Sequence, residues 1–549
     1  MLAGWQYVAY YVNQNDKEIN NSDDNDGQVE TKSRPTRNVC LARRKLDASS
    51  YAKSRRSDRD QTLGVSDGES EKAIWQTIVF DDYEQVLNDG HNTISLGLSH
   101  SDGSIHLSFD NHNTSLVYRR SCSTLDLISQ PDEVPYRDVV GGWSKKSFQE
   151  VREGLEGLDT AEFESATYPR FLSLPASSDS SASLLLEFRT GMAGLGDTRM
   201  YVYGSRSGDD SSGTSSYGWE ARGVVLQGVG CNAYVPHSQP RESRVDLHEV
   251  ERVTEAYFSS MPASVHLTWT YRSYIPVTLK DSQQQAGPNG PENNHDLYYA
   301  WSPFEEDRPG AMGGPGRRWF NGMGELIGMA GKPVVSGSAD APSSPGLGPV
   351  IPTSPGILAY KTSAGNKGIT NQESQAVDSQ GGVHVLNREE VDGLERWVYY
   401  TLPEASDGIF NGRVWERHLL PHPKYSPASV FHPRGKMFCA THYDVPHLYI
   451  FLPRELDLVL IRRSLRIKPG WRGEWEEVLR LPGARMMEVL VDEERLNRWD
   501  HVLSVYIGKY FPEEMEFDRH RRIDENTGEE CDYSGQRRDS WMSILDITL

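Results

Sequence analysis

Residues 101–109 read SDGSIHLSF, and this stretch decides the fold that we expect for the chain. A turn of Ser, Asp and Gly leads into alternating apolar and polar residues, a pattern that predicts a half-buried β-strand. The preceding segment 94–98 alternates in the same way. The two segments are therefore predicted to pair as a hairpin across the turn.

The same unit of turn, aliphatic residue, histidine and aliphatic residue recurs twice, as SQGGVHVL at 379–386 and more loosely as ASVHLTW at 263–269. Segments with a tryptophan accompany these units, at Trp219, Trp319, Trp415 and Trp475. A repeated strand unit fits radial blades better than a sandwich, because a sandwich of this length would need several domains. We therefore predict an all-β chain that folds as one β-propeller over residues 1–549.

Short alternating strands are predicted along the rest of the chain, and long amphipathic helices are almost absent. The strands include 78–80, 184–188, 200–203, 265–269, 297–301, 383–386, 397–400 and 448–452. Polar stretches between them bury too little apolar surface to order themselves. Among these stretches we expect 13–36 and 47–72 to be disordered insertions and the charged segment 513–537 to cover the closure of the ring.

The composition, 37% hydrophobic and 25% charged, is typical of a soluble globular protein. Lys and Arg total 57 against 78 Asp and Glu, a formal charge of −21 that disfavours nucleic acid as a partner. No run of about 18 apolar residues occurs, so we expect neither a transmembrane helix nor a membrane partner. The five cysteines are widely spaced and contain no CxxC pair, which indicates neither a zinc ribbon nor a disulfide framework.

Four histidines lie within residues 89–120: His91, His100, His106 and His112. His106 sits within the predicted strand, so we expect an outward or cross-strand structural residue, and we expect His100 beside the turn to face solvent. His91 and His112 lie at strand ends, where a rigid sheet holds functional side chains on loops. Because histidine titrates near neutral pH, these two are the candidates for chemistry.

An arginine, Arg189, ends the predicted strand 184–188 and opens the glycine-rich turn 191–196, where the backbone can approach a ligand closely. Guanidinium is always charged and binds carboxylates in a bidentate manner, so Arg189 is a candidate carboxylate clamp. The alternative is a structural salt bridge that holds the turn.

Three later segments alternate aromatic and hydrogen-bonding side chains, at 230–234, 268–272 and 294–296. Such side chains suit sugar rings, although the same residue types also fill ordinary propeller cores. Composition alone leaves both interpretations open.

The stretch DGHNTISLGLSHSDGSIHLSFDNHNTSLVYRRS, followed in order by SATYPRF, LLLEFRTGMAGLGD, CNAY, VHLTWTYR, NHDLYYAWS and NQESQAVDSQGGVHVL, resembles the BNR-repeat (BNR_4) family. That family includes ulvan lyases and fungal lyases that act on the rhamnose–glucuronate linkage of gum arabic. The resemblance covers roughly Trp5 to Ile544. It implies a seven-bladed β-propeller and a polysaccharide lyase that acts at a uronic acid.

The family motifs place four catalytic residues in this sequence: His91, His112, Tyr168 and Arg189. They place Tyr234 as a substrate-binding residue, and the neighbouring candidates for binding are Asn92, Asn232, Arg272 and His295. This chain departs from its relatives in a serine-rich insertion at 176–183. The turn at 192–196 reads MAGLG, where relatives usually have SGNG.

The implied reaction is β-elimination, which removes the proton beside the uronate carboxylate and expels the sugar at carbon 4. Arg189, with or without His91, would neutralise the carboxylate, and Tyr168 would serve as base, acid or both. His112 would share proton transfer or polarise Tyr168. Tyrosine ordinarily titrates near pH 10, so it needs adjacent cations to act as a base.

The substrate implied by the resemblance is an acidic polysaccharide or oligosaccharide that contains glucuronate and rhamnose, cut by a monomeric enzyme with no required cofactor. A structural divalent ion is compatible with the sequence. The alternatives are a sialidase-type hydrolase, for which no arginine triad and Tyr/Glu pair is evident, and a carbohydrate-binding propeller without catalysis. Hydrolysis at a metal is disfavoured, because an arginine would repel the ion.

The resemblance also implies an extracellular protein. The segment 1–12 is apolar and aromatic but lacks a charged leading region and a cleavage site, so we expect a strand and not a signal peptide. A start inside a longer gene product is compatible with this pattern.

Overall fold

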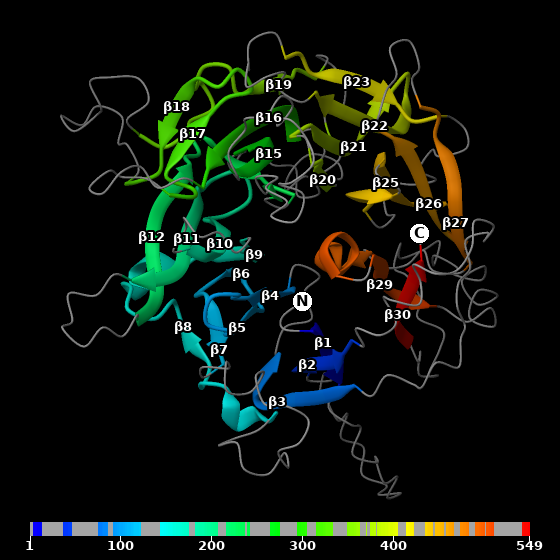
Figure 1. Ribbon diagram of the computed structural model, residues 1–549. Helices are drawn as coiled ribbons and strands as arrows, with labels where there is room; N and C mark the ends of the chain where they lie inside the picture. The colour runs from blue at the N-terminus through cyan, green and yellow to red at the C-terminus, as the bar shows by residue number, and fades with distance from the viewer. Residues whose placement is uncertain are drawn as a thin grey trace, which may run out of the picture.

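The computed structural model shows a ring of sheets around a central axis (Figure 1). It describes residues 4–13, 37–46, 75–85, 92–121, 143–174, 182–206, 216–236, 239–241, 264–274, 294–304, 314–332, 348–362, 369, 374–379, 381–403, 413–421, 434–442, 445–454, 457–465, 473–482, 489–499, 501–509 and 541–548. The strands follow one another around the ring in chain order, from blue to red. The predicted seven-bladed β-propeller is confirmed.

Seven antiparallel sheets form the blades. Blade 1 holds β1 (Trp5–Asn13), β2 (Arg37–Lys45) and β3 (Gln76–Gln85); blade 2 holds β4 (Ile94–Leu98), β5 (Ile105–Phe109), β7 (Val117–Arg120) and β8 (Arg152–Glu153); blade 3 holds β6 (His112–Thr114), β9 (Ala166–Ser173), β10 (Ala182–Thr190), β11 (Thr198–Arg206) and β12 (Ser216–Leu226); blade 4 holds β13 (Cys231–Tyr234), β14 (Gln239–Arg241), β15 (Ser264–Ser273), β16 (Asn294–Pro303), β17 (Arg318–Phe320), β18 (Leu326–Met329) and β19 (Leu358–Tyr360); blade 5 holds β20 (Ser374–Val377), β21 (Val383–Val391), β22 (Leu394–Leu402) and β23 (Glu416–Leu419); blade 6 holds β24 (Lys436–His442), β25 (Val445–Arg454), β26 (Asp457–Ser464) and β27 (Glu476–Leu481); blade 7 holds β28 (Leu490–Val491), β29 (Val502–Lys509) and β30 (Trp541–Thr548).

Each of the eight short segments predicted as strands lies within a strand of these blades. Helical turns in the described part of the chain are short, at Lys145–Ser147, Thr160–Phe163 and Arg495–Trp499. The expected insertions at 13–36 and 47–72 lie outside the described residues, apart from the last residue of β1. The expected closing segment 513–537 lies outside them entirely.

The hairpin predicted from the opening motif is present, with Ile94 paired to Phe109 and Leu98 paired to Ile105. The expectation of a half-buried strand was wrong, because all five residues of β5 are buried. A blade packs against a neighbour on each of its two faces, so the polar positions of the alternation are covered as well. His106, expected to point outward or across the sheet, is 0% exposed.

His106 is nevertheless a structural residue, because both of its ring nitrogens have partners. Its Nδ1 lies 2.7 Å from Tyr118 Oη, and its Nε2 lies 2.8 Å from Ser104 Oγ. The two repeats of the motif make the same contact, since Nδ1 of His266 and of His384 lies 2.8 Å from a tyrosine hydroxyl on the next strand of its blade. The repeated unit therefore encodes a buried His–Tyr pair in three blades.

Three of the tryptophans that accompany the repeats cover these pairs from the following blade. Trp219, Trp415 and Trp475 meet the tyrosines Tyr118, Tyr299 and Tyr399 edge to face, with ring centroids 6.2, 5.5 and 5.9 Å apart. Edge-to-face aromatic contacts add to the energy of area burial. We call each set a His–Tyr–Trp unit; it joins one blade to the next.

His100 does not face solvent as we expected. Its side chain is 21% exposed, and its Nε2 lies 3.2 Å from Glu494 Oε1, in the connection between β28 and β29 of blade 7. The contact joins blade 2 to the far end of the chain, and a local sequence pattern cannot show this.

A polar network also joins the first and last blades. Arg44 of β2 donates two hydrogen bonds to Asp546 of β30, at 2.7 and 2.8 Å. Arg495 reaches the same carboxylate at 2.9 Å, and Gln6 donates to Asp492 at 2.8 Å. These contacts hold the ends of the ring together.

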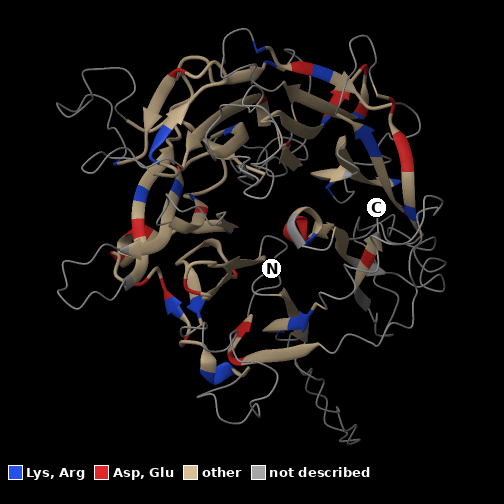
Figure 2. Ribbon diagram, viewed as in Figure 1, with Lys and Arg blue, Asp and Glu red and all other residues tan. Residues whose placement is uncertain are grey.

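Figure 2 shows Lys and Arg interleaved with Asp and Glu around the ring. None of the helices that the structure describes is long and apolar enough to cross a membrane. Within the same residues Cys40, Cys231 and Cys439 are free thiols.

Candidate active site

Tyr168 occupies a strained bulge on β9. The β9–β10 register pairs Arg170 with Glu187 and Thr167 with Arg189, so Tyr168 and Pro169 together oppose one residue of β10. Tyr168 also has a φ of 55°, a left-handed conformation that is unfavourable for a bulky side chain. Bulges and strained residues concentrate at functional sites, where they redirect a side chain.

A row of four residues crosses blade 3 beside this bulge. Successive register pairs run from His112 on β6 to Thr167 on β9, then to Arg189 on β10 and Thr198 on β11. Directly opposed residues of neighbouring strands project to the same face, about 5 Å apart. Two candidates separated by 77 positions in the sequence, His112 and Arg189, are thus brought two strands apart.

The corner before His112 is tied to blade 1. Asp110 has a φ of 58°, accepts a hydrogen bond from Gln85 Nε2 at 2.7 Å, and also accepts one from the Tyr11 hydroxyl. A left-handed residue with several side-chain contacts fixes the direction of the chain that follows. His112 therefore begins β6 from an anchored corner.

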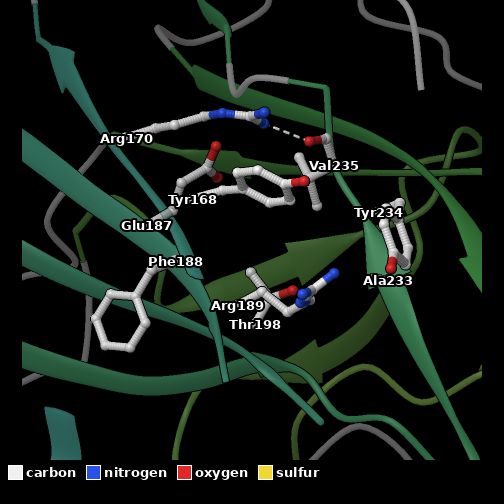
Figure 3. Close-up of a pocket in the computed structure, with 9 residues that line it drawn as sticks. All are labelled: Tyr168, Arg170, Glu187, Phe188, Arg189, Thr198, Ala233, Tyr234 and Val235. Carbon is white, nitrogen blue, oxygen red and sulfur yellow. Dashed lines mark hydrogen bonds between the residues drawn. The ribbon is translucent and has the colours of Figure 1, made fainter. Parts of the chain in front are cut away.

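A pocket of about 310 Å³, part of it open to solvent, lies between this row and the first strand of blade 4. Its lining residues are Tyr168, Arg170, Glu187, Phe188, Arg189, Thr198, Ala233, Tyr234 and Val235 (Figure 3). Three of the sequence candidates, Tyr168, Arg189 and Tyr234, meet here.

Arg189 is the central cation of the pocket. The residue is only 8% exposed, and its Cζ lies 5.5 Å from the centroid of the Tyr168 ring and 4.9 Å from that of Tyr234. Its guanidinium makes no hydrogen bond or ion pair with any residue that the structure describes, and its buried Nε lacks a partner there. The alternative of a structural salt bridge thus finds no support in the described residues.

Tyr234 is held between two arginines. Arg272 Nη1 donates to the Tyr234 hydroxyl at 2.8 Å, and its Cζ lies 4.9 Å from the ring centroid, the same distance as Arg189 on this ring. Arg272 therefore fixes the orientation of a wall of the pocket, although it does not line the pocket itself.

Burial raises the pKa of the Tyr168 phenol above its usual value of 10, and the cations Arg434, Arg189 and Arg170 oppose this effect. In Figure 3 the Tyr168 ring lies between Arg170 and Arg189. Arg170 Cζ lies 5.8 Å from the ring centroid, and Arg170 donates to the carbonyl of Val235. With burial as the largest effect, the phenol keeps its proton at neutral pH.

The other predicted binding residues lie outside the pocket lining. Asn232 is fully buried and holds the glycine-rich turn, because it accepts from Gly194 N at 3.0 Å and donates to Met192 O at 2.9 Å. His295 lies 3.4 Å from both Ser273 Oγ and Asp296 Oδ2 in blade 4. His91 lies outside the described residues, and Asn92, the first residue after that gap, is half-buried.

Sequence reasoning missed Arg170, Thr198 and Arg434. The motif SATYPRF contains Arg170, so its position beside Tyr168 was a usable signal. The strand register, which the sequence does not show, brings Thr198 opposite Arg189. In the part of the chain that the structure describes, no group of three or more His, Cys, Asp or Glu side chains could hold a metal ion.

The family described as "BNR repeat-containing family member" (BNR_4) matches residues 5–417. Among solved structures, the polysaccharide lyase Uly1 is 13% identical over 93% of this chain and 85% of its own, with a TM-score of 0.49. AofleA from Arthrobotrys oligospora is 8% identical over 76% of this chain and 79% of its own, with a TM-score of 0.32. No curated protein sequence matches significantly. At these identities and TM-scores, neither solved structure bears on the substrate or the reaction.

Proposed function

The chain belongs to the BNR repeat-containing family, and from this premise and the geometry of the pocket we propose that it is a polysaccharide lyase. The substrate is an acidic glycan, and the enzyme cleaves the bond at carbon 4 of a glucuronate residue by β-elimination. The observation that carries the proposal is Arg189, a buried cation whose guanidinium has no anionic partner among the described residues. An unpaired buried charge is strongly unfavourable, so a site that keeps one is built to receive its counterion from a ligand.

A uronate carboxylate is the counterion that suits the pocket. The aromatic rings of Tyr168 and Tyr234 flank Arg189, and rings of this kind also pack against sugars. Neutralising the carboxylate makes the proton at carbon 5 easier to remove, because the negative charge that develops spreads onto the carboxylate oxygens. Arg189 therefore acts on both binding and reaction.

In the elimination, a base takes the proton from carbon 5 and the bond between carbon 4 and its oxygen breaks. A double bond forms between carbons 4 and 5, and the departing oxygen takes up a proton. Tyr168 keeps its proton at neutral pH because burial raises its pKa, so we assign it as the acid that protonates the departing oxygen. His112, in the same transverse row as Arg189, is the base in this assignment.

We extend the proposal to glucuronate linked to rhamnose, as the motif resemblance implies. The turn after Arg189 exposes two apolar side chains, Met192 at 51% and Leu195 at 41%. An apolar surface on a rigid turn suits the methyl group of a 6-deoxy sugar such as rhamnose. Substrates of this type are extracellular polymers, so we also propose an extracellular location.

The test is to offer gum arabic and ulvan separately to the wild type and to Tyr168→Phe, with ultraviolet absorbance to detect the unsaturated uronate. We expect the absorbance to rise with the wild type on at least one polymer. The rate of this rise should be roughly 10² to 10⁴-fold lower with the variant. Reducing sugar without the absorbance would identify a hydrolase and overturn the proposal. Binding of the polymers without any product would identify a non-catalytic propeller.

A further inference from the structure

We propose that Thr198 binds the substrate carboxylate together with Arg189, its hydroxyl donating to one carboxylate oxygen while the guanidinium holds the other. This inference rests on the proposed function, because it assigns a further residue to the same uronate. Thr198 is the first residue of β11 and lines the pocket.

The hydroxyl of Thr198 is buried without a partner. The residue is 2% exposed, and its Oγ1 has no hydrogen-bond partner among the residues that the structure describes. Buried hydroxyls are nearly always hydrogen-bonded, so an orphan that borders a pocket indicates a missing partner in that pocket. The orphan Nε of Arg189 borders the same pocket.

Thr167, the threonine on the other side of Arg189, has a hydroxyl with a hydrogen-bond partner. Arg189 pairs with Thr167 on β9 and with Thr198 on β11. The Thr167 hydroxyl accepts a hydrogen bond from Asn113 N at 2.8 Å and so supports the corner beside His112. The two threonines occupy equivalent positions about Arg189, and the one that lines the pocket is the one left without a partner.

A carboxylate satisfies both orphans. It offers two oxygens, so one can accept from the guanidinium and the other from the hydroxyl, and bonds to a charged acceptor are stronger than neutral ones. When the proton leaves carbon 5, negative charge moves onto these oxygens and both bonds strengthen. Thr198 is therefore expected to support the reaction rate as well as binding.

The experiment compares Thr198→Val, which removes the hydroxyl at nearly constant shape, with Thr198→Ser, which restores it. The matched control is Thr270→Val, because Thr270 is 1% exposed and its Oγ1 is likewise without a described partner, yet it does not line the pocket. Binding of free glucuronate by calorimetry and elimination kinetics on the preferred polymer are measured for each protein, with the melting temperature as the check on folding.

We expect Thr198→Val to bind glucuronate about tenfold more weakly and to lose at least as much in kcat/KM. Thr198→Ser should recover most of both losses, and neither valine variant should melt earlier than the wild type, because each loses an unsatisfied group. Equal glucuronate affinity and kcat/KM in Thr198→Val and the wild type would overturn the role of Thr198 and leave the lyase intact. If the wild type bound free glucuronate but cleaved none of the polymers by elimination, the proposed lyase activity would be overturned. The comparison of glucuronate affinity between Thr198→Val and the wild type would still test the binding role of Thr198.

Discussion

The blade interfaces and the pocket use the same residue types in opposite states. In the His–Tyr–Trp unit of blade 2, each ring nitrogen of His106 has a partner and the ring is fully buried. In the pocket, Arg189 and Thr198 are also buried, yet each has a polar atom without a partner among the described residues. Tyr168 adds a left-handed backbone that the tyrosines of the units do not have.

The difference teaches that residue type does not separate structure from function in this chain. A satisfied polar group stabilises the fold, and an orphaned or strained one costs stability that a ligand can return. Variants in the two regions should therefore have opposite effects on stability and activity.

The largest effect is expected from Arg189→Met. Because Arg189 neutralises the substrate carboxylate, the variant should lose roughly 10³-fold or more in kcat/KM. Because it removes a buried charge without a described partner, its melting temperature should be unchanged or higher. Steady-state kinetics and thermal unfolding measure the two effects.

Arg199→Met is the matched control for loss of an arginine in the same blade. Arg199 lies on β11 outside the pocket lining, 3.5 Å from Glu162 in a partly exposed ion pair. Its loss should change stability by less than about 1 kcal/mol and leave kcat/KM unaltered. A clear drop in melting temperature for Arg189→Met, larger than in the control, would show that Arg189 is structural after all.

The reverse outcome is expected from His266→Leu in the unit of blade 4. The substitution removes the ring nitrogens that lie 2.8 Å from the Tyr299 hydroxyl and 3.0 Å from the Ser264 hydroxyl. We expect a loss of about 2 to 3 kcal/mol in the free energy of unfolding. Denaturant unfolding measures the loss, and kcat per folded molecule should stay at the wild-type value. If kcat fell while the free energy of unfolding stayed unchanged, His266 would act on catalysis, and the distinction between the blade interfaces and the pocket would be wrong.

The sequence could predict the repeated strands but not their environment. Alternation and the turn at 101–103 were enough to predict the β4–β5 hairpin, and the repeated motif was enough to predict a propeller, whereas the number of blades came from the family resemblance. Alternation cannot show whether a second layer covers the polar face, so His106 was expected outside and lies inside. His100 was misplaced for a related reason, since its partner Glu494 is nearly 400 positions away.

Residue type and motif selected three residues that line one pocket. Tyr168, Arg189 and Tyr234 meet in the pocket as the motifs implied, although their roles stay proposals. Thr198 has no distinguishing type, and its significance comes from the β10–β11 register and from its missing partner. Such states depend on the whole fold and are invisible along the chain.

We expect His106, in the His–Tyr–Trp unit of blade 2, to make the stability of the fold depend on pH. Burial lowers the pKa of His106 to about 3, with Arg120 adding to the effect and Asp102 opposing it. The unfolded chain takes up this proton near pH 6.5, so the stabilising contribution is present above that pH and is lost as the pH falls towards 3. The free energy of unfolding should fall by about 1.4 kcal/mol per pH unit in this window on account of His106 alone.

The comparison is between the wild type and His106→Leu, by denaturant unfolding at several pH values between the two limits. The variant should be less stable than the wild type at neutral pH. Its free energy of unfolding should then fall less steeply with decreasing pH, by the amount that one bound proton contributes. Parallel slopes in the two proteins would mean that His106 titrates alike in the folded and unfolded states, which would contradict its description as a neutral buried residue.

The smallest effect, a few-fold loss of rate, is expected from Arg170→Gln and tests the acid role of Tyr168. Arg170 is partly exposed and 5.8 Å from the Tyr168 ring, so its favourable effect on the phenol is screened. Without this cation the pKa of Tyr168 rises further, the phenol becomes a weaker acid, and protonation of the departing oxygen slows. Arg170→Lys keeps the charge and should keep most of the rate. A synthetic glucuronate with an aryl ether at carbon 4 needs little help from an acid, so the Gln variant should match the wild type on it. An equal loss on the aryl substrate and the polymer would instead place Arg170 in substrate binding and remove the support that it gives to Tyr168.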